Sequence, residues 1–222
     1  MNIFDNELDF ACPNDEGYRL HIARTPAMRE IVYRLRYRAY TDAGVKLYRD
    51  DGIFPDKFDH CRNCISHVLL QNGIVIGSIR ANRCTCADES VGAQEAYADD
   101  IAAVIGTGQT YVESNRFVVD PDVSNKSLAP LRCLFRGIVL HAALIDADWV
   151  ITAVRTRHIA FYRRILGMEQ LSEPKPYPLL TGEFALMGIN YQTKAEAVYK
   201  RLPDLRPTDE LVQHYAQAVG YQ

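Results

Sequence analysis

A carboxylate and a guanidinium lie three residues apart in the segment YVESNRFVVDP, which spans residues 111–121. The pattern of residues 111–119 predicts a β-strand, in which Glu113 and Asn115 share one face while Arg116 lies on the other. A local bulge before Arg116 would bring both charges to one site. Glu113 could then act as an acid or base beside Arg116, which could bind the substrate. The alternative is an edge strand whose charges are solvated.

Further charged residues extend this pattern, namely Arg36, Asp56, Asp59 and Arg80. Arginine binds carboxylates through two parallel hydrogen bonds, so Arg80 with Arg116 or Arg36 could bind a substrate carboxylate. Asp56 and Asp59 would pair with these arginines or hold a substrate ammonium group. The alternative is that all five charges form one buried network, which fixes an N-terminal helix and the loop after it.

The order of predicted helices and strands indicates a mixed sheet with helices on its faces. Asn72-Gly73 is a strong turn signal, so residues 65–71 and 74–82 should form a hairpin. Gly167 is the expected stop of a helix. Residues 1–17 are expected to be loose, and residues 44–64 to form a long, lid-like loop. The remaining predicted elements are helices at 26–43, within 87–106, and at 128–142, 156–166, 194–201 and 208–219, and strands at 148–154 and 184–191.

The chain has 222 residues, a net charge of -3 and no apolar run of membrane-spanning length. Its N-terminus is acidic and lacks a secretion signal, so we expect a cytoplasmic protein. We expect one domain over residues 1–192, with a helical extension at 193–222 packed on it. Residues 126–164 carry seven Lys/Arg against two Asp. This local excess suits a phosphate-bearing ligand or an acidic protein partner better than nucleic acid.

The order of elements resembles that of the GNAT acyltransferase superfamily. Residues 157–168 read RHIAFYRRILGM, which is similar to that superfamily's late signature of an aromatic pair, a basic turn and a Gly-hydrophobic exit. The resemblance implies that Tyr162 protonates the departing thiolate. The alternative for Tyr162 is ordinary amphipathic packing.

A narrower resemblance covers residues 26 to about 190. Arg36 and Tyr40, Asp56 and Asp59, Arg80, and then Glu113 and Arg116 look like the charged framework of acyl-homoserine-lactone synthases. They also look like that of the related N-acyl amino acid synthases, which take a fatty acyl group from acyl carrier protein, and of PEP-CTERM-associated acyltransferases. The chain lacks the early Trp of the lactone synthases and the Gly-rich phosphate loop of coenzyme A enzymes. It therefore resembles the N-acyl amino acid synthases best.

Acyl transfer to an amine needs a base, and Glu113 is the candidate that accepts the amine proton, directly or through water. Arg116 beside it would keep Glu113 ionised. The alternative is a structural ion pair between the two residues. The guanidinium groups of Arg36, Arg80 and Arg116 would then bind the carboxylate of an amino acid acceptor.

The donor is expected to be an acyl-phosphopantetheine thioester, with no redox or nucleotide cofactor. Backbone groups of residues 117–119 (Phe117, Val118 and Val119) would bind the pantetheine amides where neighbouring strands separate. The helix N-terminus at Ser127 and Leu128 would hold a phosphate, with added charge from Lys126 and Arg132. The alternative for the basic residues is a solvated helix face. The residues expected to receive an acidic carrier protein are Arg132, Arg136, Arg157, Arg163 and Arg164.

Six cysteines are expected to be reduced or metal-bound in the cytoplasm. Four of them flank the predicted hairpin and could gather at its open end, with His60 nearby. A structural zinc is one interpretation, and an incidental or redox-active cluster is the other, because Cys-x-Cys is not the usual second half of a zinc site. The four are Cys61, Cys64, Cys84 and Cys86.

We therefore predict an α/β domain of GNAT type that moves a medium or long fatty acyl group from acyl carrier protein to the amine of an amino acid. The alternatives are a coenzyme A-dependent N-acetyltransferase, an acyl-homoserine-lactone synthase and a non-catalytic module that binds an acyl metabolite. An acyl chain requires an apolar tunnel. Candidates to line it, which core packing explains equally well, are Ile138, Val139, Ala142 and Val150.

Overall fold

A computed structural model of the chain describes residues 10–11, 17–47, 49–85, 92–123, 128–178 and 180–220. Cys12, Cys86, Lys126 and Ser127, which carry predictions above, lie outside these residues. No helix in the described part of the chain is long and apolar enough to cross a membrane.

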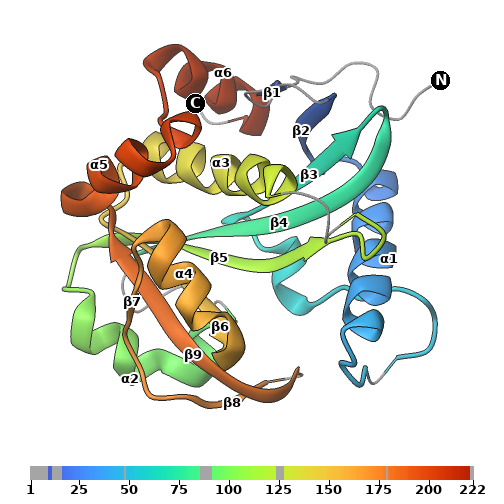
Figure 1. Ribbon diagram of the computed structural model, residues 1–222, viewed down its shortest axis with the longest axis horizontal. Helices are drawn as coiled ribbons and strands as arrows, with labels where there is room; N and C mark the ends of the chain where they lie inside the picture. The colour runs from blue at the N-terminus through green and yellow to red at the C-terminus, as the bar shows by residue number, and fades with distance from the viewer. Residues whose placement is uncertain are drawn as a thin grey trace.

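The described strands form one mixed sheet in the order β1-β2-β3-β4-β5-β6-β9-β7, with β8 on β9 (Figure 1). Every pairing is antiparallel except β5 with β6, which is parallel. This is the mixed, mostly antiparallel sheet that the order of elements predicted. The strands are β1 Phe10–Ala11, β2 Tyr18–Ile22, β3 Cys64–Gln71, β4 Ile74–Thr85, β5 Thr110–Val119, β6 Trp149–Arg155, β7 Glu169–Gln170, β8 Lys175–Tyr177 and β9 Leu180–Asn190.

Helices cover both faces of this sheet, and in Figure 1 α3 and α6 lie above β4 and β5 while α1 stands at the right. A Cβ atom at Gly137 would lie 2.6 Å from the His67 ring, so glycine allows α3 to pack closely on β3. The helices are α1 Pro26–Asp42, α2 Gln94–Val104, α3 Ala129–Leu144, α4 Ile159–Leu166, α5 Tyr191–Arg201 and α6 Asp209–Val219, with 3-10 turns η1 Lys57–His60, η2 Thr156–His158 and η3 Pro203–Leu205.

The two faces of β4 carry different chemistry because side chains alternate along a strand. Ile79 and Ala81 are fully buried in the core that α3 covers, together with Leu134. Arg80 and Asn82 are also buried, but they point to the opposite face, toward α1 and the loop after it. The sheet thus separates an apolar core on one side from a polar site on the other.

The turn and cap signals of the sequence are confirmed. Asn72 and Gly73 have φ values of 52° and 80°, as a tight hairpin turn requires, and β3 pairs with β4 across them. Gly167 ends α4 in the left-handed conformation, with φ 66°. The expected helix at 156–166 is instead one 3-10 turn followed by α4.

The N-terminal region departs from the prediction. Residues 1–17 were expected to be loose and no strand was expected after them, but β1 and β2 extend the sheet along the edge of β3. The two short strands β7 and β8 were also missed, and both pair with β9. These strands are too short to show a hydrophobic period, so their pairing depends on the neighbouring strand rather than on their own sequence.

The C-terminal helices pack against α3. Tyr215 of α6 is fully buried, and its ring lies edge-on to His141 of α3 with centroids 6.0 Å apart. Arg132 of α3 donates to Asp204 in η3 over 2.7 Å. The expected tunnel residues Ile138, Ala142 and Val150 lie in the core beneath these helices, with Val139 packed against it, which is the packing alternative considered for them.

Candidate active site

A bulge in β5 brings Asn115 and Arg116 to one face of the sheet. Ser78 of β4 pairs with Val118, and Arg80 pairs with Asn115, so the one residue between them on β4 faces two on β5. Arg116 takes up the extra length with φ 51°, which is rare for a residue with a side chain. The bulge that the spacing of the charges suggested is therefore present.

Five buried charges are connected in a row across the site. Arg116 Nε lies 2.6 Å from Asp56 Oδ2, and Asp56 Oδ1 lies 2.6 Å from Arg80 Nη1. The same Arg80 nitrogen lies 2.9 Å from Asp59, which lies 2.8 Å from Arg36 Nη1. These ion pairs connect α1, the loop before η1, β4 and β5, and they involve the charged residues that the sequence analysis identified. All five side chains are at most 8% exposed.

Local backbone bonds fix the two aspartates. The Asp56 carboxylate accepts from Phe58 N over 2.8 Å, and the Asp59 carboxylate accepts from Asp56 N over 2.8 Å, which together cap η1. Burial opposes ionisation of Asp56, but the guanidinium groups of Arg116 and Arg80 outweigh burial. They hold the pKa of Asp56 well below its usual value.

Glu113 is fully buried next to this row of charges. Both of its carboxylate oxygens accept from Ala93 N at 3.1 Å, and Oε1 also accepts from Asn115 Nδ2 at 2.9 Å. Burial raises the pKa of Glu113, and the hydrogen bonds and nearby Arg80 and Arg116 oppose this only in part. The charge of Arg116 favours the ionised form of Glu113, as expected, but burial outweighs it, and Arg116 Nε binds Asp56.

Asn115 links Glu113 to the arginines, a role that sequence reasoning missed. Its Oδ1 accepts from Arg80 Nε over 2.6 Å, while its Nδ2 donates to Glu113 and, over 3.1 Å, to Asn82 Oδ1. The period of two along a strand had placed Asn115 on the face of Glu113. That signal was sufficient to mark it as a partner of the carboxylate.

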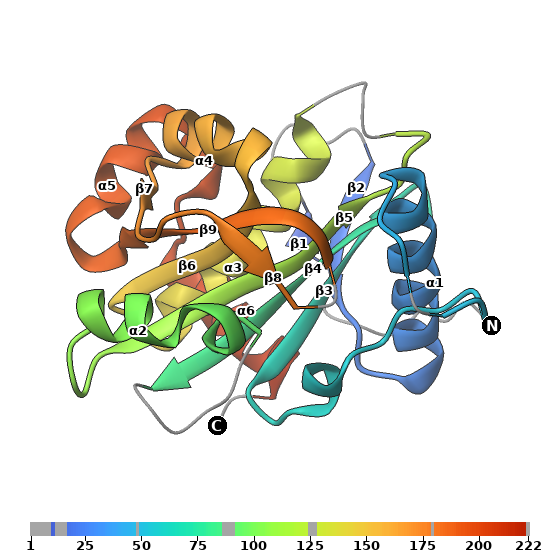
Figure 2. The same cartoon turned by 90° about the horizontal axis from the view of Figure 1, so that it is seen from below.

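A cleft opens where β5 and β6 separate. The two strands pair only from Tyr111 to Glu113 with residues 149–151, so the later residues of both strands have no ladder bonds to each other (Figure 2). The cleft has a volume of about 470 Å³. Residues on its walls include Asn115, Arg116, Phe117, Val118 and Val119 from β5 and Thr152, Ala153, Val154 and Arg155 from β6.

The expected donor-binding residues fall into two groups. Phe117, Val118 and Val119 line the cleft, as does Leu128, which caps α3 and is 56% exposed. Arg132 instead donates to Asp204, as described above.

The alternative of a solvated basic face on α3 is wrong for Arg136. Arg136 follows Arg132 by one turn, and its side chain is buried, with only 8% of the residue exposed. The C-terminal helices cover this side of α3, which the spacing of two arginines could not indicate. Arg136 is therefore not available at the surface, whereas the Arg132 side chain is 33% exposed and paired with Asp204.

Tyr162 also lines the cleft, from α4 on the far side of β6. Its ring is edge-on to Phe135 of α3, with centroids 5.9 Å apart, and Phe135 stacks on Phe117 of β5 at 5.6 Å. Burial raises the pKa of Tyr162. Its hydroxyl therefore keeps its proton at neutral pH, as a proton donor must.

Comparison with known proteins now identifies the family. Residues 31–190 match the family model of the N-acyl amino acid synthase FeeM. The chain belongs to this family. It is an acyltransferase with a GNAT-like fold, as its resemblance to that superfamily predicted. No curated protein sequence matches it.

Solved structures of FeeM-like and lactone-forming synthases share the fold of this FeeM-family chain. FeeM, an N-acyl amino acid synthase from uncultured soil microbes, is 18% identical, with a TM-score of 0.70 over 83% of this chain and 97% of that one. The acyl-homoserine-lactone synthase LasI is 12% identical, with a TM-score of 0.62 over 84% and 97%. BjaI, a CoA-dependent acyl-homoserine-lactone synthase solved with SAM and isopentyl-CoA, is 19% identical, with a TM-score of 0.59 over 91% and 99%.

The three hairpin cysteines that the structure describes, Cys61, Cys64 and Cys84, do not form the metal site that the zinc interpretation required. Cys64 pairs with Asn82 across the hairpin, whereas Cys84 is fully buried in a cluster with Tyr111. Within the described ranges, no group of three or more His, Cys, Asp or Glu side chains is placed to hold a metal ion. The fourth thiol of the expected set, Cys86, lies outside those ranges.

Proposed function

We propose that this FeeM-family enzyme transfers a medium or long fatty acyl group from the thioester of acyl carrier protein to the amine of an amino acid. The observation that carries this proposal is the position of the cleft. Its lining combines apolar side chains, such as Phe117 and Leu131, with Arg116 and Asn115, and Asn115 bonds the buried Glu113. Acyl donor and charged acceptor can therefore meet at one point.

The free edge of β5 supports binding of a phosphopantetheine arm. β4 bonds to one edge of Val118 and Val119, and no described strand bonds to the other edge, which faces the cleft. Amide groups of an extended ligand can add to such an edge as a further strand would. Apolar side chains of Leu128, Leu131 and Leu180 around the same cleft suit an acyl chain.

Arg116 is the arginine that can bind the carboxylate of the acceptor. Arg36 and Arg80 lie deep in the network and share Asp59, and neither lines the cleft. Arg116 uses Nε for Asp56, and its two Nη groups make no hydrogen bond to any residue that the structure describes. A guanidinium with a free pair of donors on the cleft wall matches a carboxylate in geometry and charge.

The reaction follows from these positions. The neutral amine attacks the thioester carbonyl carbon, and the nitrogen loses a proton whose final acceptor is Glu113. When the tetrahedral intermediate collapses, the C–S bond breaks and Tyr162 gives its proton to the thiolate. A carboxylate with a raised pKa is a more effective base near neutral pH than an ordinary glutamate.

Exposed arginines at the cleft support a carrier protein as the donor. Arg157 lines the cleft, and Arg163 and Arg164 of α4 are exposed beside it. A cluster of positive charges at the opening would attract an acidic carrier protein. Coenzyme A is the competing donor, and the solved CoA-dependent synthase BjaI shares the fold.

A reducing location is part of the proposal. Cys61, Cys64 and Cys133 carry free thiols, which support a compartment such as the cytoplasm.

Mass spectrometry of lipid extracts tests the reaction, in cells that overproduce either the wild type or Glu113→Gln. We expect new N-acyl amino acids with the wild type that disappear with the variant, which would also identify acceptor and chain length. Purified enzyme with acyl carrier protein and acyl-CoA thioesters then compares the donors. Absence of any acylated amino acid with either donor would overturn the proposal, and equal product from both proteins would remove Glu113 as the base.

A further inference from the structure

Glu113 has no direct contact with the cleft. Its residue is 0% exposed, and the cleft wall is formed by its neighbours on β5 instead. If Glu113 accepts the proton of a bound amine, a chain of hydrogen bonds must connect the amine to Glu113. Some group between the cleft and Glu113 must therefore carry the proton.

Tyr177 stands at that position, at the end of β8. Its side chain lines the cleft although the residue is only 8% exposed. Its ring is held between Tyr97 and Phe184, with centroid distances of 6.1 Å and 5.2 Å. The hydroxyl is not fully enclosed, and it makes no hydrogen bond with any of the described residues. A rigidly held tyrosine with an unused hydroxyl at a cleft is available to a substrate.

Gly92 shows that this hydroxyl borders Glu113. A Cβ atom at Gly92 would lie 2.9 Å from Tyr177 Oη and 3.4 Å from Glu113 Oε1, so both oxygens face the same small space. The negative charge of Glu113 adds to burial in raising the pKa of Tyr177. The two oxygens do not bond in this structure, and catalytic hydrogen bonds commonly tighten only when substrate binds.

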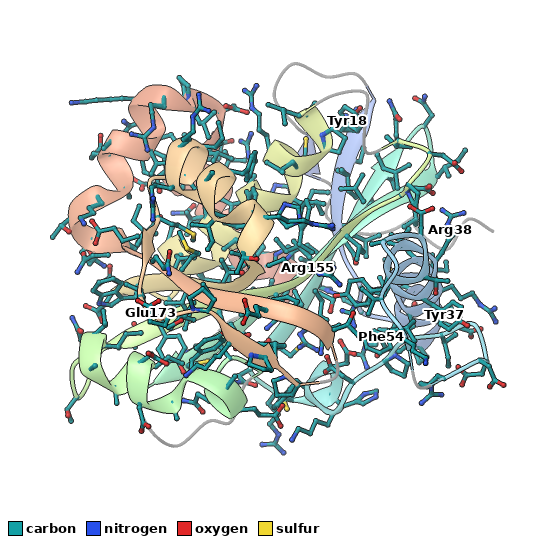
Figure 3. All side chains as sticks on the ribbon, turned by 60° about the horizontal axis from the view of Figure 1, so that its bottom comes forward. Tyr18, Tyr37, Arg38, Phe54, Arg155 and Glu173 are labelled. Carbon is teal, nitrogen blue, oxygen red and sulfur yellow. The ribbon has the colours of Figure 1, made fainter. Side chains whose placement is uncertain are left out.

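Figure 3 shows the surroundings of this path. Arg155, at the end of β6, lies near the centre of the view, and Phe54 lies closer to α1. Arg155 is on the cleft wall, and Phe54 packs against the Arg116 guanidinium with its ring centroid 5.5 Å away. Tyr177 lines the same cleft as Arg116, and the charge of Arg116 acts on the pKa of Tyr177, so an acceptor carboxylate bound at Arg116 would lie near Tyr177.

We propose that Tyr177 is a further catalytic residue, which relays the proton of the acceptor amine from the cleft to Glu113. The N–H bond of the attacking amine breaks as its proton binds the Tyr177 oxygen. The original phenolic proton passes to a carboxylate oxygen of Glu113, so Tyr177 ends neutral and unchanged. This inference rests on the proposed function, because it assumes an amine acceptor.

Tyr177→Phe removes the hydroxyl and keeps the ring stack. We expect kcat with an amino acid acceptor to fall by about 100-fold or more, while KM for the acyl donor stays within about twofold. An aminooxy acid has a far less basic nitrogen that needs no such help to lose its proton. With this acceptor the variant should approach the wild-type rate, which a merely structural defect would not allow.

Two further variants separate chemistry from folding. Tyr97→Phe is the matched control, since it removes a hydroxyl that donates to Phe184 O over 2.7 Å in the same ring stack. It should lower the melting temperature and keep the relay. Gly92→Ala should place a methyl group 2.9 Å from Tyr177 Oη, which displaces the hydroxyl from Glu113, and it should reduce kcat as Tyr177→Phe does. The backbone at Gly92 is not left-handed, so alanine can adopt its conformation.

The possible outcomes test the proton relay through Tyr177 separately from the proposed acyl transfer to an amino acid. A Tyr177→Phe enzyme with near-wild-type kcat would overturn the relay and leave the proposed function intact. A defect of equal size with amino and aminooxy acceptors would also overturn the relay, because it would indicate a structural role. Failure of the wild type to acylate any amino acid would overturn both proposals together.

Discussion

Arg116 and Asp56 form an ion pair of 2.6 Å that ties the β5 bulge to the loop before η1. The pair uses Nε of the guanidinium, so it orients the two Nη groups without occupying them. The side chain of Asp56 is 4% exposed and also binds Arg80. One buried carboxylate therefore binds both the arginine on the cleft wall and the arginine beneath it.

Asp56→Asn should destabilise the protein and weaken acceptor binding. Breaking a buried ion pair leaves its partners without a counter-charge and costs about 3–5 kcal/mol. Urea denaturation should show this loss, and KM for the acceptor should rise because Arg116 loses its orientation. Asp51→Asn is the control, since Asp51 pairs with Arg49 at the surface and should show no measurable change. Equal stability of both variants would contradict a structural role for the network.

The acid limb of the pH–rate profile should report Glu113. Burial raises its pKa, so kcat/KM should fall with decreasing pH at a higher value than for an ordinary glutamate. The Asn115 amide bonds the charged form, and Asn115→Leu should therefore move this limb further toward neutral pH. Ser114→Ala, at the neighbouring position of β5, is the control and should not shift the acid limb. An acid limb that shifts to lower pH in Asn115→Leu would contradict the assignment.

Two buried histidines predict a loss of stability in acid. Burial lowers the pKa of His67 to about 3 and that of His141 to about 4, the latter with help from the charge of Arg83. Below the unfolded value of about 6.5, the unfolded chain binds protons that the native state does not. The free energy of unfolding should therefore decrease as pH falls from about 6.5 toward 4, by about 1.4 kcal/mol per pH unit for each histidine.

Urea denaturation at several pH values checks this dependence. His141→Gln should have a shallower slope than the wild type over the same range, because one of the two histidines no longer titrates in the unfolded chain. His67 bonds the Tyr215 hydroxyl at 2.8 Å and is left intact in this variant. An identical slope in both proteins would contradict the lowered pKa of His141.

The width of the cleft should control acyl chain length. Ala153 of β6 lies on its wall, as do Phe117 and Val118 of β5. Ala153→Phe should shift the products toward shorter acyl chains, as measured by mass spectrometry of the N-acyl amino acids. Ala102→Phe, at an exposed position of α2, adds the same bulk elsewhere and should not change the chain-length profile.

Charge reversal on α4 should distinguish the two donors. Arg163→Glu with Arg164→Glu should raise KM for acyl carrier protein by about tenfold and leave KM for acyl-CoA nearly unchanged, because the effect depends on charge complementarity across a protein surface. KM of the wild type for the carrier should also rise with salt. Arg34→Glu, at an exposed site on α1, serves as the control. Equal effects on both thioesters would contradict docking at α4.

Several features were predictable from the sequence because they depend on nearby residues. The turn at Asn72-Gly73 and the stop at Gly167 follow from backbone conformations that these residues favour. The long helix α3 follows from its apolar spacing. The spacing of Glu113 and Arg116 suggested the bulge, since period two alone would have separated their faces.

The tertiary structure decided how the charges are shared and which side chains reach the cleft. Five charged residues from four distant segments could pair in several ways, and only their packing shows that Arg116 lines the cleft while Arg36 and Arg80 lie away from it. Burial, not sequence, raises the pKa of Glu113. Tyr177 has no pattern that marks it, because its position depends on the pairing of β8 with β9 beside a glycine far away in the chain. Local sequence determines backbone conformation, whereas contacts between remote segments and the loss of water around them are properties of the folded chain.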